Sequence, residues 1–404
     1  MTLRILVTDG PNKNALSVIR SLGKSKENRL GVTTPVHEVM TLCSFSKYCH
    51  KTHFLKPEST PESKIGGYRA FHSGDVEGVD SYAEKLLDIV NEDGYDVLMP
   101  VGLESYMAAS KHAKKFGESA GVAVPEWEKM QIAFNKEVTM KFAEEVGVPI
   151  PKTTNLLSEN DLELIDVYPV VIKSSDSFLR YCNNKNELLG SFRFIKDHAK
   201  MGIICQEYVK GFGCGFYGVY DRGKLIAHFL HKRLTELPAT GGASAMAESY
   251  FDERLRNYGE KLCGALKWHG PIMAEFKYDA ENDDYRLIEL NPKLWGSLDL
   301  TIAAGIDVPG ILLAIALGKK PEVSAGYKYV KYKWLFPDHF WALVSDFSFV
   351  NLKEFIGSGG DVQTNFYPDD VAPFMVQMMR GFVECPAVFV NSRREYPHGK
   401  VRRR

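Results

Sequence analysis

The stretch PIMAEFKYDAENDDYRLIELNPKLWGS, residues 271–297, carries the strongest fold signal in the chain. Two runs in which polar and apolar residues alternate flank the polar turn AENDD, residues 280–284, and this pattern predicts a hairpin of two antiparallel strands. A turn that closes symmetrically places Glu275 directly across from Glu289. Asn291 lies on the same face, because the side chains of a strand alternate with a period of two.

The same symmetric closure pairs Asp279 with Tyr285 and leaves the opposite face of the hairpin apolar. A continuous apolar face predicts packing against a hydrophobic core. The residues expected on that face are Ile272, Ala274, Phe276, Tyr278, Ile288 and Leu290.

The two facing carboxylates of Glu275 and Glu289 repel each other, and like charges across a strand pair destabilise a hairpin. A cation between them removes the repulsion. Oxygen ligands from two glutamates and Asn291 suit Mg²⁺, a hard cation that is usually completed by water and by substrate phosphates. The alternative is a solvated hairpin face, on which scattered glutamates are common.

The end of this stretch, IELNPKLWGS, resembles the E-x-N-P-R-x-x-G-S segment of ATP-grasp enzymes, above all the carbamoyl-phosphate synthase large subunit and short carboligases related to it. The resemblance implies the ATP-grasp fold, with Glu275, Glu289 and Asn291 holding the Mg²⁺ ions that bridge the phosphates of ATP. Mn²⁺ is an alternative metal. Lys293 stands where the family usually has arginine, so it neutralises phosphate as a point charge without a bidentate contact.

The resemblance extends upstream to residues that would contact the nucleotide. Lys136, before GVPIP, and Lys173, at the end of PVVIK, fall where ATP-grasp proteins place their two phosphate-contacting lysines. A glycine-rich flap normally follows the second lysine, but here SSDSFLRYCNN follows, so the hydroxyls of Ser174, Ser175 and Ser177 would replace backbone contacts. For either lysine alone, a solvated surface charge is the commoner reading.

The segment CQEYVKG, residues 205–211, resembles the hinge between the two ATP-grasp subdomains. The resemblance implies that a glutamate side chain accepts from the adenine amino group and that backbone atoms read the edge of the ring. The adenine-binding residues implied here are Gln206, Glu207 and Val209.

The segment HKRLTELPATGGASA, residues 231–245, predicts a loop at the mouth of a cleft, because it combines charges, a proline and a double glycine. It resembles the R-x-x-E-x-P-x-x-G-G loop of the short carboligases. Arg233 would pair with a carboxylate or with the transferred phosphoryl group, and Glu236 would orient Arg233 or the nucleophile. An ordinary ion pair between Arg233 and Glu236 is the alternative, and His231 is expected to pack rather than to act as a base.

The glycines at 213, 215 and 218 spell G-x-G-x-x-G after a strand, which is the pattern of a dinucleotide-binding loop. That loop requires a helix next. The following residues, FYGVYDRGKLIAHFL, instead predict two strands joined at the turn DRG, so a nicotinamide-cofactor site is not expected.

The alternation of strand and helix patterns from LRILVT at 3–8 onward predicts a parallel, doubly wound sheet, as the N-terminal domain of the resembled family requires. Substrate contacts from this domain are expected near Asp9, Gly10 and residues 100–105, where strands end. The expected domains are a Rossmann-like pre-ATP-grasp α/β domain (1–125), an ATP-grasp domain (126–322, with a lid lobe at about 150–206, a hinge at 206–210 and a metal-binding lobe at 211–322) and a C-terminal segment of unknown role (323–404).

The overall charge gives no reason to expect nucleic acid or a membrane as a partner, because 50 Lys and Arg residues against 51 Asp and Glu residues leave a net charge of -1. Seven scattered cysteines without a C-x-x-C pair indicate reduced thiols, and the start lacks the pattern of a signal peptide, so a cytoplasmic location is expected. The aromatic residues near 327–341 and the resemblance favour a homodimer.

The function implied by the resemblance is that of an ATP-dependent ligase, which activates a small carboxylate as an acyl phosphate and couples it to an amine or another nucleophile. Two alternatives stay open. One is phosphorylation of bicarbonate or carbamate, as in carbamoyl-phosphate synthase. The other is a catalytically weak, ATP-binding regulatory protein, which Lys293 and the serine-rich flap suggest.

Overall fold

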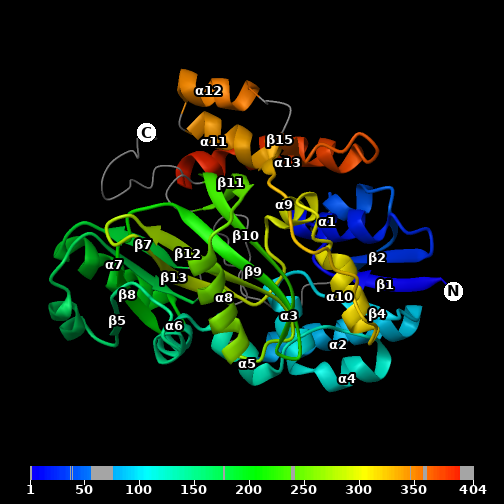
Figure 1. Ribbon diagram of the computed structural model, residues 1–404, viewed down its shortest axis with the longest axis horizontal. Coiled ribbons are helices and arrows are strands. Elements are labelled where there is room, and N and C mark those ends of the chain that lie inside the picture. The colour runs from blue at the N-terminus through cyan, green and yellow to red at the C-terminus, as the bar shows by residue number, and fades with distance from the viewer. Residues whose placement is uncertain are drawn as a thin grey trace.

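The computed structural model describes residues 2–36, 38, 40–55, 76–175, 178–237, 242–345, 347–357 and 362–391. Strands and helices alternate in the N-terminal part and form a parallel sheet with the strand order β3-β2-β1-β4, as the sequence predicts (Figure 1). The elements of this part are β1 (Leu3–Val7), α1 (Lys13–Leu22), β2 (Asn28–Pro35), η1 (Leu42–Phe45), β3 (Cys49–Leu55), α2 (Val76–Asp93), β4 (Val97–Met99), α3 (Leu103–Lys111), α4 (Ala113–Ser119) and α5 (Trp127–Phe134).

A small antiparallel sheet follows, with the strand order β5-β8-β6-β7 and helix α7 packed against it. Its buried hydrophobic side chains, except that of Ile204, form a core separate from that of the rest of the chain. Its elements, with the helix that precedes it, are α6 (Lys136–Glu145), β5 (Thr153–Leu156), η2 (Glu159–Leu164), β6 (Val170–Ser174), β7 (Leu179–Cys182), α7 (Lys185–His198) and β8 (Ile203–Glu207).

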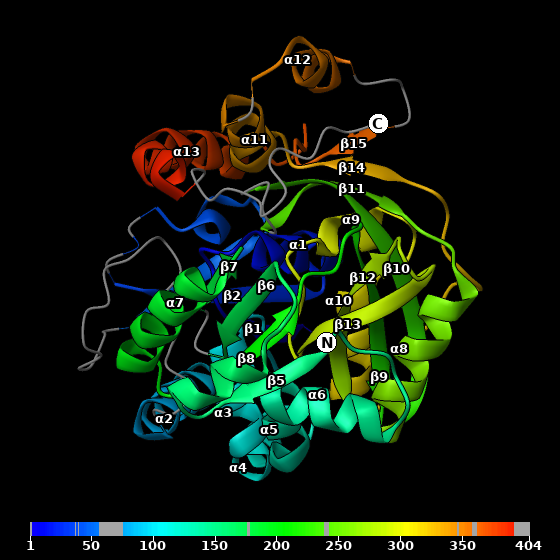
Figure 2. The same cartoon turned by 90° about the vertical axis from the view of Figure 1, so that its left-hand side faces the viewer.

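The large sheet has the strand order β13-β12-β9-β10-β11-β14-β15 (Figure 2). Its last two strands come from the C-terminal segment, whose place in the fold the sequence did not reveal. Its elements, with their helices, are β9 (Gly213–Asp221), β10 (Lys224–Leu237), β11 (Ala243–Ser249), α8 (Glu253–Ala265), β12 (Gly270–Asp279), β13 (Asp284–Asn291), α9 (Leu298–Ala303), α10 (Val308–Ala316), β14 (Lys331–Lys333) and β15 (Val362–Thr364).

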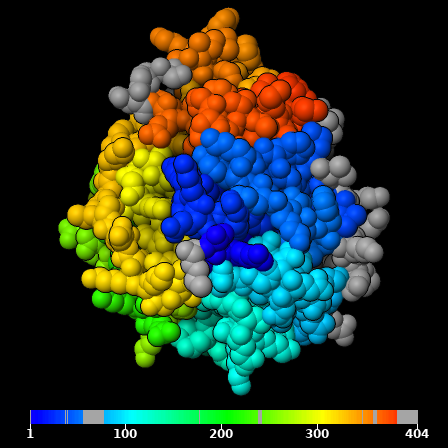
Figure 3. Space-filling view, turned by 90° about the vertical axis from the view of Figure 1, so that its right-hand side faces the viewer, coloured from blue at the N-terminus to red at the C-terminus, as the bar shows by residue number. Residues whose placement is uncertain are grey.

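The remaining C-terminal elements lie together at one end of the molecule and contact the N-terminal part (Figure 3). Arg20 of α1 donates to Asp370 over 2.8 Å, and both side chains are almost fully buried. Asp370 also accepts from the hydroxyl of Ser46 and from the backbone N–H of Lys47, each over 2.9 Å. These elements are η3 (Leu335–His339), α11 (Phe340–Ser345), α12 (Phe349–Ile356) and α13 (Ala372–Asn391).

The predicted hairpin is present as β12 and β13, and Glu275 pairs with Glu289 as predicted. The expected pairing of Asp279 with Tyr285 is wrong, because Asp279 pairs with Asp284 across a tighter turn. Between the turn and Phe276 the residues pair one position off the predicted register, so Phe276 pairs with Leu287. A register shift between Glu275 and Phe276 then restores the predicted pairing of the two glutamates. Leu287 is buried while Ile288 is only partly buried, which corrects the expected apolar face.

The prediction of a loop over 231–245 is wrong for most of its length, because β10 continues to Leu237 and pairs with β11. Residues 238–241 of that segment, and Ser177 of the flap, lie outside the described residues. The turn between β9 and β10 is confirmed. Arg222 and Gly223 both have positive φ, as a two-residue hairpin turn requires, so a strand and not a helix follows the glycine pattern.

Across the described ranges, no helix combines the length and apolar character that a membrane crossing needs. The cysteines described there are free thiols, as expected.

Candidate active site

One face of the large sheet gathers most of the predicted polar residues. Glu275 pairs with Gly215 on β9 and with Glu289 on β13, so the two glutamates share a face. Arg233 joins this face from β10, where the neighbouring strand has Gly213. A Cβ atom at Gly213 would approach Glu236 Oε1 to 2.9 Å and Arg233 Cδ to 3.0 Å, so the glycine makes room for this ion pair.

Arg233 links two carboxylates in the site. Its Nη2 lies 2.7 Å from Glu275 Oε2, and its Nη1 lies 3.2 Å from Glu236 Oε1. Burial raises the pKa of Glu275, Arg233 opposes this rise, and the charge of Glu289 adds to it. Arg233 is therefore one of the cations that offset the repulsion between the two glutamates.

Glu289 has its own polar partners. Lys136 Nζ lies 3.4 Å from Glu289 Oε2, and Asn291 Nδ2 donates to Glu289 Oε1 over 2.8 Å. Burial by itself raises the pKa of Glu289, but Lys136, the Asn291 hydrogen bond and Lys173 outweigh burial and lower it to about 2. Glu289 is therefore a permanent anion at neutral pH.

The donor set fits a Mg²⁺ ion. Glu275, Glu289 and Asn291 offer carboxylate and amide oxygens from two adjacent strands. Among the described residues no group of three or more His, Cys, Asp or Glu side chains is arranged to hold a metal ion, so a closed structural metal site is not formed there. Two carboxylates and an amide leave most coordination positions to water and phosphate, which is the arrangement that Mg²⁺ favours.

Lys173 reaches from the small sheet to the large sheet, where its Nζ donates to the carbonyl of Ile288 over 3.0 Å. Burial, with a smaller contribution from Lys136, lowers the pKa of Lys173 to about 8. Ser175 accepts from the backbone N–H of Lys136 over 2.8 Å. The Ser174 hydroxyl is buried and has no hydrogen-bond partner within the described part of the chain.

The three residues that the resemblance assigns to adenine lie at and after the end of β8, and each has an internal contact. Gln206 Nε2 donates to Thr153 Oγ1 over 2.8 Å, and Glu207 accepts from the backbone N–H of Lys152 over 2.9 Å. The carbonyl of Val209 accepts from Lys277 Nζ over 3.2 Å. Their contacts with adenine stay predictions.

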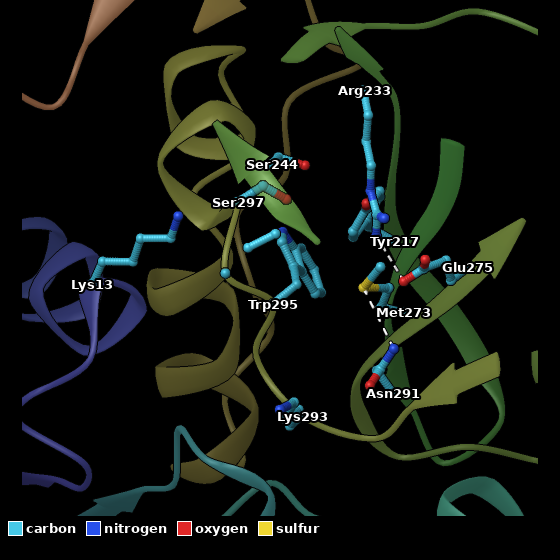
Figure 4. Close-up of a pocket in the computed structure, with 12 residues that line it drawn as sticks. Lys13, Tyr217, Arg233, Ser244, Met273, Glu275, Asn291, Lys293, Trp295 and Ser297 are labelled. Carbon is cyan, nitrogen blue, oxygen red and sulfur yellow. Dashed lines mark hydrogen bonds and ion pairs between the residues drawn. The ribbon is translucent and has the colours of Figure 1, made fainter. Parts of the chain in front are cut away.

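A cavity of about 160 Å³ opens beside Glu275 (Figure 4). It brings together Arg233, Glu275, Asn291 and Lys293, all of which the sequence had singled out. Among the described residues Lys293 forms no ion pair, so its charge is available to an anion. The other residues that line the cavity are Lys13, Tyr217, Ala243, Ser244, Met273, Trp295, Gly296 and Ser297.

Several of these lining residues were missed. Trp295 and Ser297 lie in the quoted stretch itself, two and four residues after Lys293, so their position was a usable signal. No motif in the sequence points to Lys13, and the substrate contacts of the N-terminal domain were expected near Asp9 instead. Asp9 is turned inward, where it accepts from the backbone N–H of Gly102 over 2.7 Å and does not line the cavity.

His231 is a packing residue, as expected. Its Nε2 contacts the hydroxyl of Tyr217, and it lies 2.8 Å from Ser297 Oγ. Burial, with a further contribution from Arg233, lowers its pKa well below the ordinary value, so His231 is neutral. A neutral, fully buried imidazole fixes the positions of Tyr217 and Ser297 at the cavity wall.

No protein-family model matches the sequence. A stretch of 97 residues is 27% identical to the septin homolog spn7 of Schizosaccharomyces pombe, and the match covers 22% of each protein. The chain thus spans about a fifth of the length of that curated relative, too little to define a fold.

Solved structures match most of the chain. One is the biotin carboxylase domain dimer of Hydrogenobacter thermophilus 2-oxoglutarate carboxylase, in complex with MgADP, ADP and bicarbonate (TM-score 0.63, 16% identity, covering 82% of this chain and 74% of that chain). Another is the L-amino acid ligase from Bacillus licheniformis (TM-score 0.60, 15% identity, covering 80% of this chain and 76% of that chain). A third is N5-carboxyaminoimidazole synthetase from Staphylococcus aureus (TM-score 0.61, 12% identity, covering 83% of this chain and 82% of that chain). Together with the paired glutamates of the hairpin, these similarities show that the chain has the ATP-grasp fold.

Proposed function

We propose that the protein is an ATP-dependent ligase that activates a carboxylate as an acyl phosphate and couples it to an amine or another nucleophile. The observation that carries this proposal is the pairing of Glu275 with Glu289 on a sheet face that Arg233, Lys136 and Lys173 surround with positive charge. Carboxylates for a divalent ion beside lysines for phosphate oxygens suit a metal-bound triphosphate. The names of the solved neighbours, which include a ligase, a synthetase and a biotin carboxylase, support the same class of reaction.

In the first step an oxygen of the substrate carboxylate attacks the γ-phosphorus of ATP, and the bond to the bridging oxygen breaks with its electron pair left on ADP. Lys136 and Lys173 neutralise the phosphate oxygens, while Arg233 and Lys293 hold the carboxylate in line. Glu236 keeps the Arg233 guanidinium oriented. Glu275, Glu289 and Asn291 would hold Mg²⁺, which would supply Lewis-acid stabilisation of the phosphoryl charge.

In the second step the nucleophile attacks the acyl carbon and loses a proton to water, and the bond from that carbon to the phosphate oxygen breaks with its electron pair left on the released phosphate. The phosphate carries charge that Arg233 and Lys293 already face, so the same two cations serve both steps. Ser174 and Ser175 are the further phosphate contacts in this proposal, and Gln206, Glu207 and Val209 are its adenine contacts.

The proposed organisation keeps the domains 1–125, 126–322 and 323–404, with the small sheet as the lid lobe of the second. It includes a cytoplasmic location and a homodimer. Gel filtration with light scattering decides the last point.

The test is release of ADP from MgATP by the purified protein in the presence of pools of amino, hydroxy and simple carboxylic acids together with amines. Release that requires both Mg²⁺ and one acid supports the proposal. Release with bicarbonate alone favours the bicarbonate-phosphorylating alternative. Binding of ATP without release of ADP in any pool favours the alternative of a regulatory ATP-binding protein.

Nucleotide binding should take up a proton through Lys173. Its pKa of about 8 means that the side chain is mostly neutral at about pH 9, and the phosphates of ATP favour the charged form. Calorimetry in buffers of different ionisation enthalpy should therefore show uptake approaching one proton at about pH 9 and almost none at about pH 6.5. Affinity should fall as the pH rises above 8.

The matched variants are Lys173→Met, which should lose the uptake, and Lys185→Met, which should keep it. Lys185 is an exposed lysine at the start of α7, the helix that packs against the same small sheet, and it pairs with Glu163. Equal proton uptake at both pH values in the unmodified protein would contradict the assignment of Lys173.

A further inference from the structure

Lys13 is the N-terminal residue that enters the cavity. It is the first residue of α1, and its side chain extends toward the segment that carries Trp295 and Ser297 (Figure 4). A Cβ atom at Gly296 would lie 3.6 Å from Lys13 Cε, which places the stem of the lysine against the backbone of that segment. Asn14, the next residue, donates to the carbonyl of Leu294 over 2.9 Å and fixes α1 against the same segment.

The C-terminal segment holds the ammonium group of Lys13 in place. Asp338 Oδ2 lies 2.5 Å from Lys13 Nζ, and the ring of Trp334 lies below it with 4.7 Å between Nζ and the ring centroid. The Lys13 side chain is 19% exposed, so its charge is largely removed from bulk water. An ammonium has three N–H donors, and Asp338 takes one of them, which leaves donors for a ligand.

The cavity has two charged ends and an apolar middle. Glu275 and Asn291 lie at one end, Lys13 lies at the other, and Trp295 stands between them in Figure 4. Tyr217 and Met273 add to the apolar wall. A volume of about 160 Å³ matches a group of roughly the size of benzene.

Ion pairs from outside the lining balance part of the charge in the cavity. Lys13, Arg233 and Lys293 line it as cations and Glu275 is the carboxylate among the described lining residues, while Asp338 pairs with Lys13 and Glu236 pairs with Arg233. A ligand with a single carboxylate between Arg233 and Lys293 leaves the remaining N–H donors of Lys13 without an acceptor. Such donors are unfavourable in a site of restricted solvent access, and a second anionic group on the ligand supplies the acceptor.

We propose that the carboxylate substrate is a small acid with a second anionic group, and that Lys13 binds this second group at the end of the cavity remote from the glutamates. The reacting carboxylate then lies between Arg233 and Lys293, and the carbon chain crosses the wall formed by Trp295. The inference rests on the proposed function, because it takes the glutamate end as the reacting end. It gives the C-terminal segment a role, since Asp338 holds the specificity-determining lysine.

The test measures binding and not turnover. The protein, saturated with a non-hydrolysable ATP analogue and Mg²⁺, is titrated by calorimetry with succinate, glutarate and adipate, and with butyrate, pentanoate and hexanoate as monocarboxylates of matched length. At least one dicarboxylate should bind about tenfold more tightly than its partner, which is the contribution of one charge-assisted hydrogen bond. In Lys13→Met the ratio should fall to about one.

Two variants serve as controls. Lys13→Arg keeps the charge and the pair with Asp338, so it should keep the preference. Unchanged affinity of Lys13→Met for the ATP analogue shows that its lost preference is not a folding defect. Lys47→Met removes an exposed lysine whose partner, Asp369, also lies in the C-terminal segment, and it should behave as the unmodified protein.

Equal affinities for the two series, binding of neither series, or a dicarboxylate preference that survives in Lys13→Met overturns the inference. Failure of the proposed function is a different result. If dicarboxylates bind through Lys13 but no amine or other nucleophile yields ADP, the ligase reaction is refuted and the assignment of Lys13 stands.

Discussion

Replacement of Glu289 by glutamine should lower ATP-dependent turnover by at least about a hundredfold, since loss of an outer metal partner alone costs about 10–100-fold and Glu289 is a direct ligand in the proposed site. The carboxylate accepts from Asn291 and faces Lys136, so it is the permanent anion of the site. A neutral amide keeps the shape and removes the charge that a divalent ion needs. The measurement is Mg²⁺-dependent ADP release together with the affinity for MgATP by calorimetry.

Glu281→Gln is the matched control, because Glu281 lies in the turn of the same hairpin, is exposed and pairs with Lys210. It should leave turnover and MgATP affinity unchanged. If Glu289→Gln retains full Mg²⁺-dependent activity while Glu281→Gln does as well, the hairpin does not hold the metal and the proposed site is refuted.

The second large effect concerns stability. Asp370→Ala should lower the free energy of unfolding by about 3–5 kcal/mol, the usual cost of removing one partner from a buried ion pair. Arg20 and Asp370 are only 6% and 2% exposed, so the substitution leaves a buried guanidinium without its counter-charge. It also removes the acceptor for Ser46 and for the backbone of Lys47. Urea unfolding followed by circular dichroism provides the measurement.

The neighbouring residue provides the comparison. Asp369 is 60% exposed and pairs with Lys47 over 3.3 Å, and exposed pairs contribute roughly 0–1 kcal/mol. Asp369→Ala should therefore shift the unfolding midpoint far less than Asp370→Ala. Equal shifts would show that the C-terminal segment is not held to α1 through a buried charge.

The hairpin illustrates which parts of the site can be read from a sequence. The pairing of Glu275 with Glu289 follows from the alternation of polar and apolar residues, and the structure confirms it. The details between the turn and the glutamates could not be predicted, because a turn one residue tighter is compensated by a bulge beside Ile288. No glycine or proline in the sequence marks the tighter turn or the bulge. The two deviations shift the register by one residue in opposite directions, so the glutamates still pair as predicted.

The polar face of α1 shows which contacts cannot be predicted from the sequence. Its apolar residues predict a helix packed on a sheet, and polar residues on the other face of such a helix normally meet water. Here that face is buried, since Ser17 donates to Asp299 over 2.7 Å and Arg20 donates to Asp370. The partners lie about 280 to 350 residues away in the chain, and no local pattern reports so distant a contact. Lys13 was missed for this reason.

The separate core of the small sheet determines how the cleft can open. In the described strands of this sheet, Ile204 is the buried residue that belongs to the main core, while its neighbours pack among themselves. Close-packed groups move most easily as intact bodies. We therefore expect the small sheet to move as a rigid body that pivots near Ile204. Opening of the cleft by this motion would break the hydrogen bond from Lys173 to the carbonyl of Ile288.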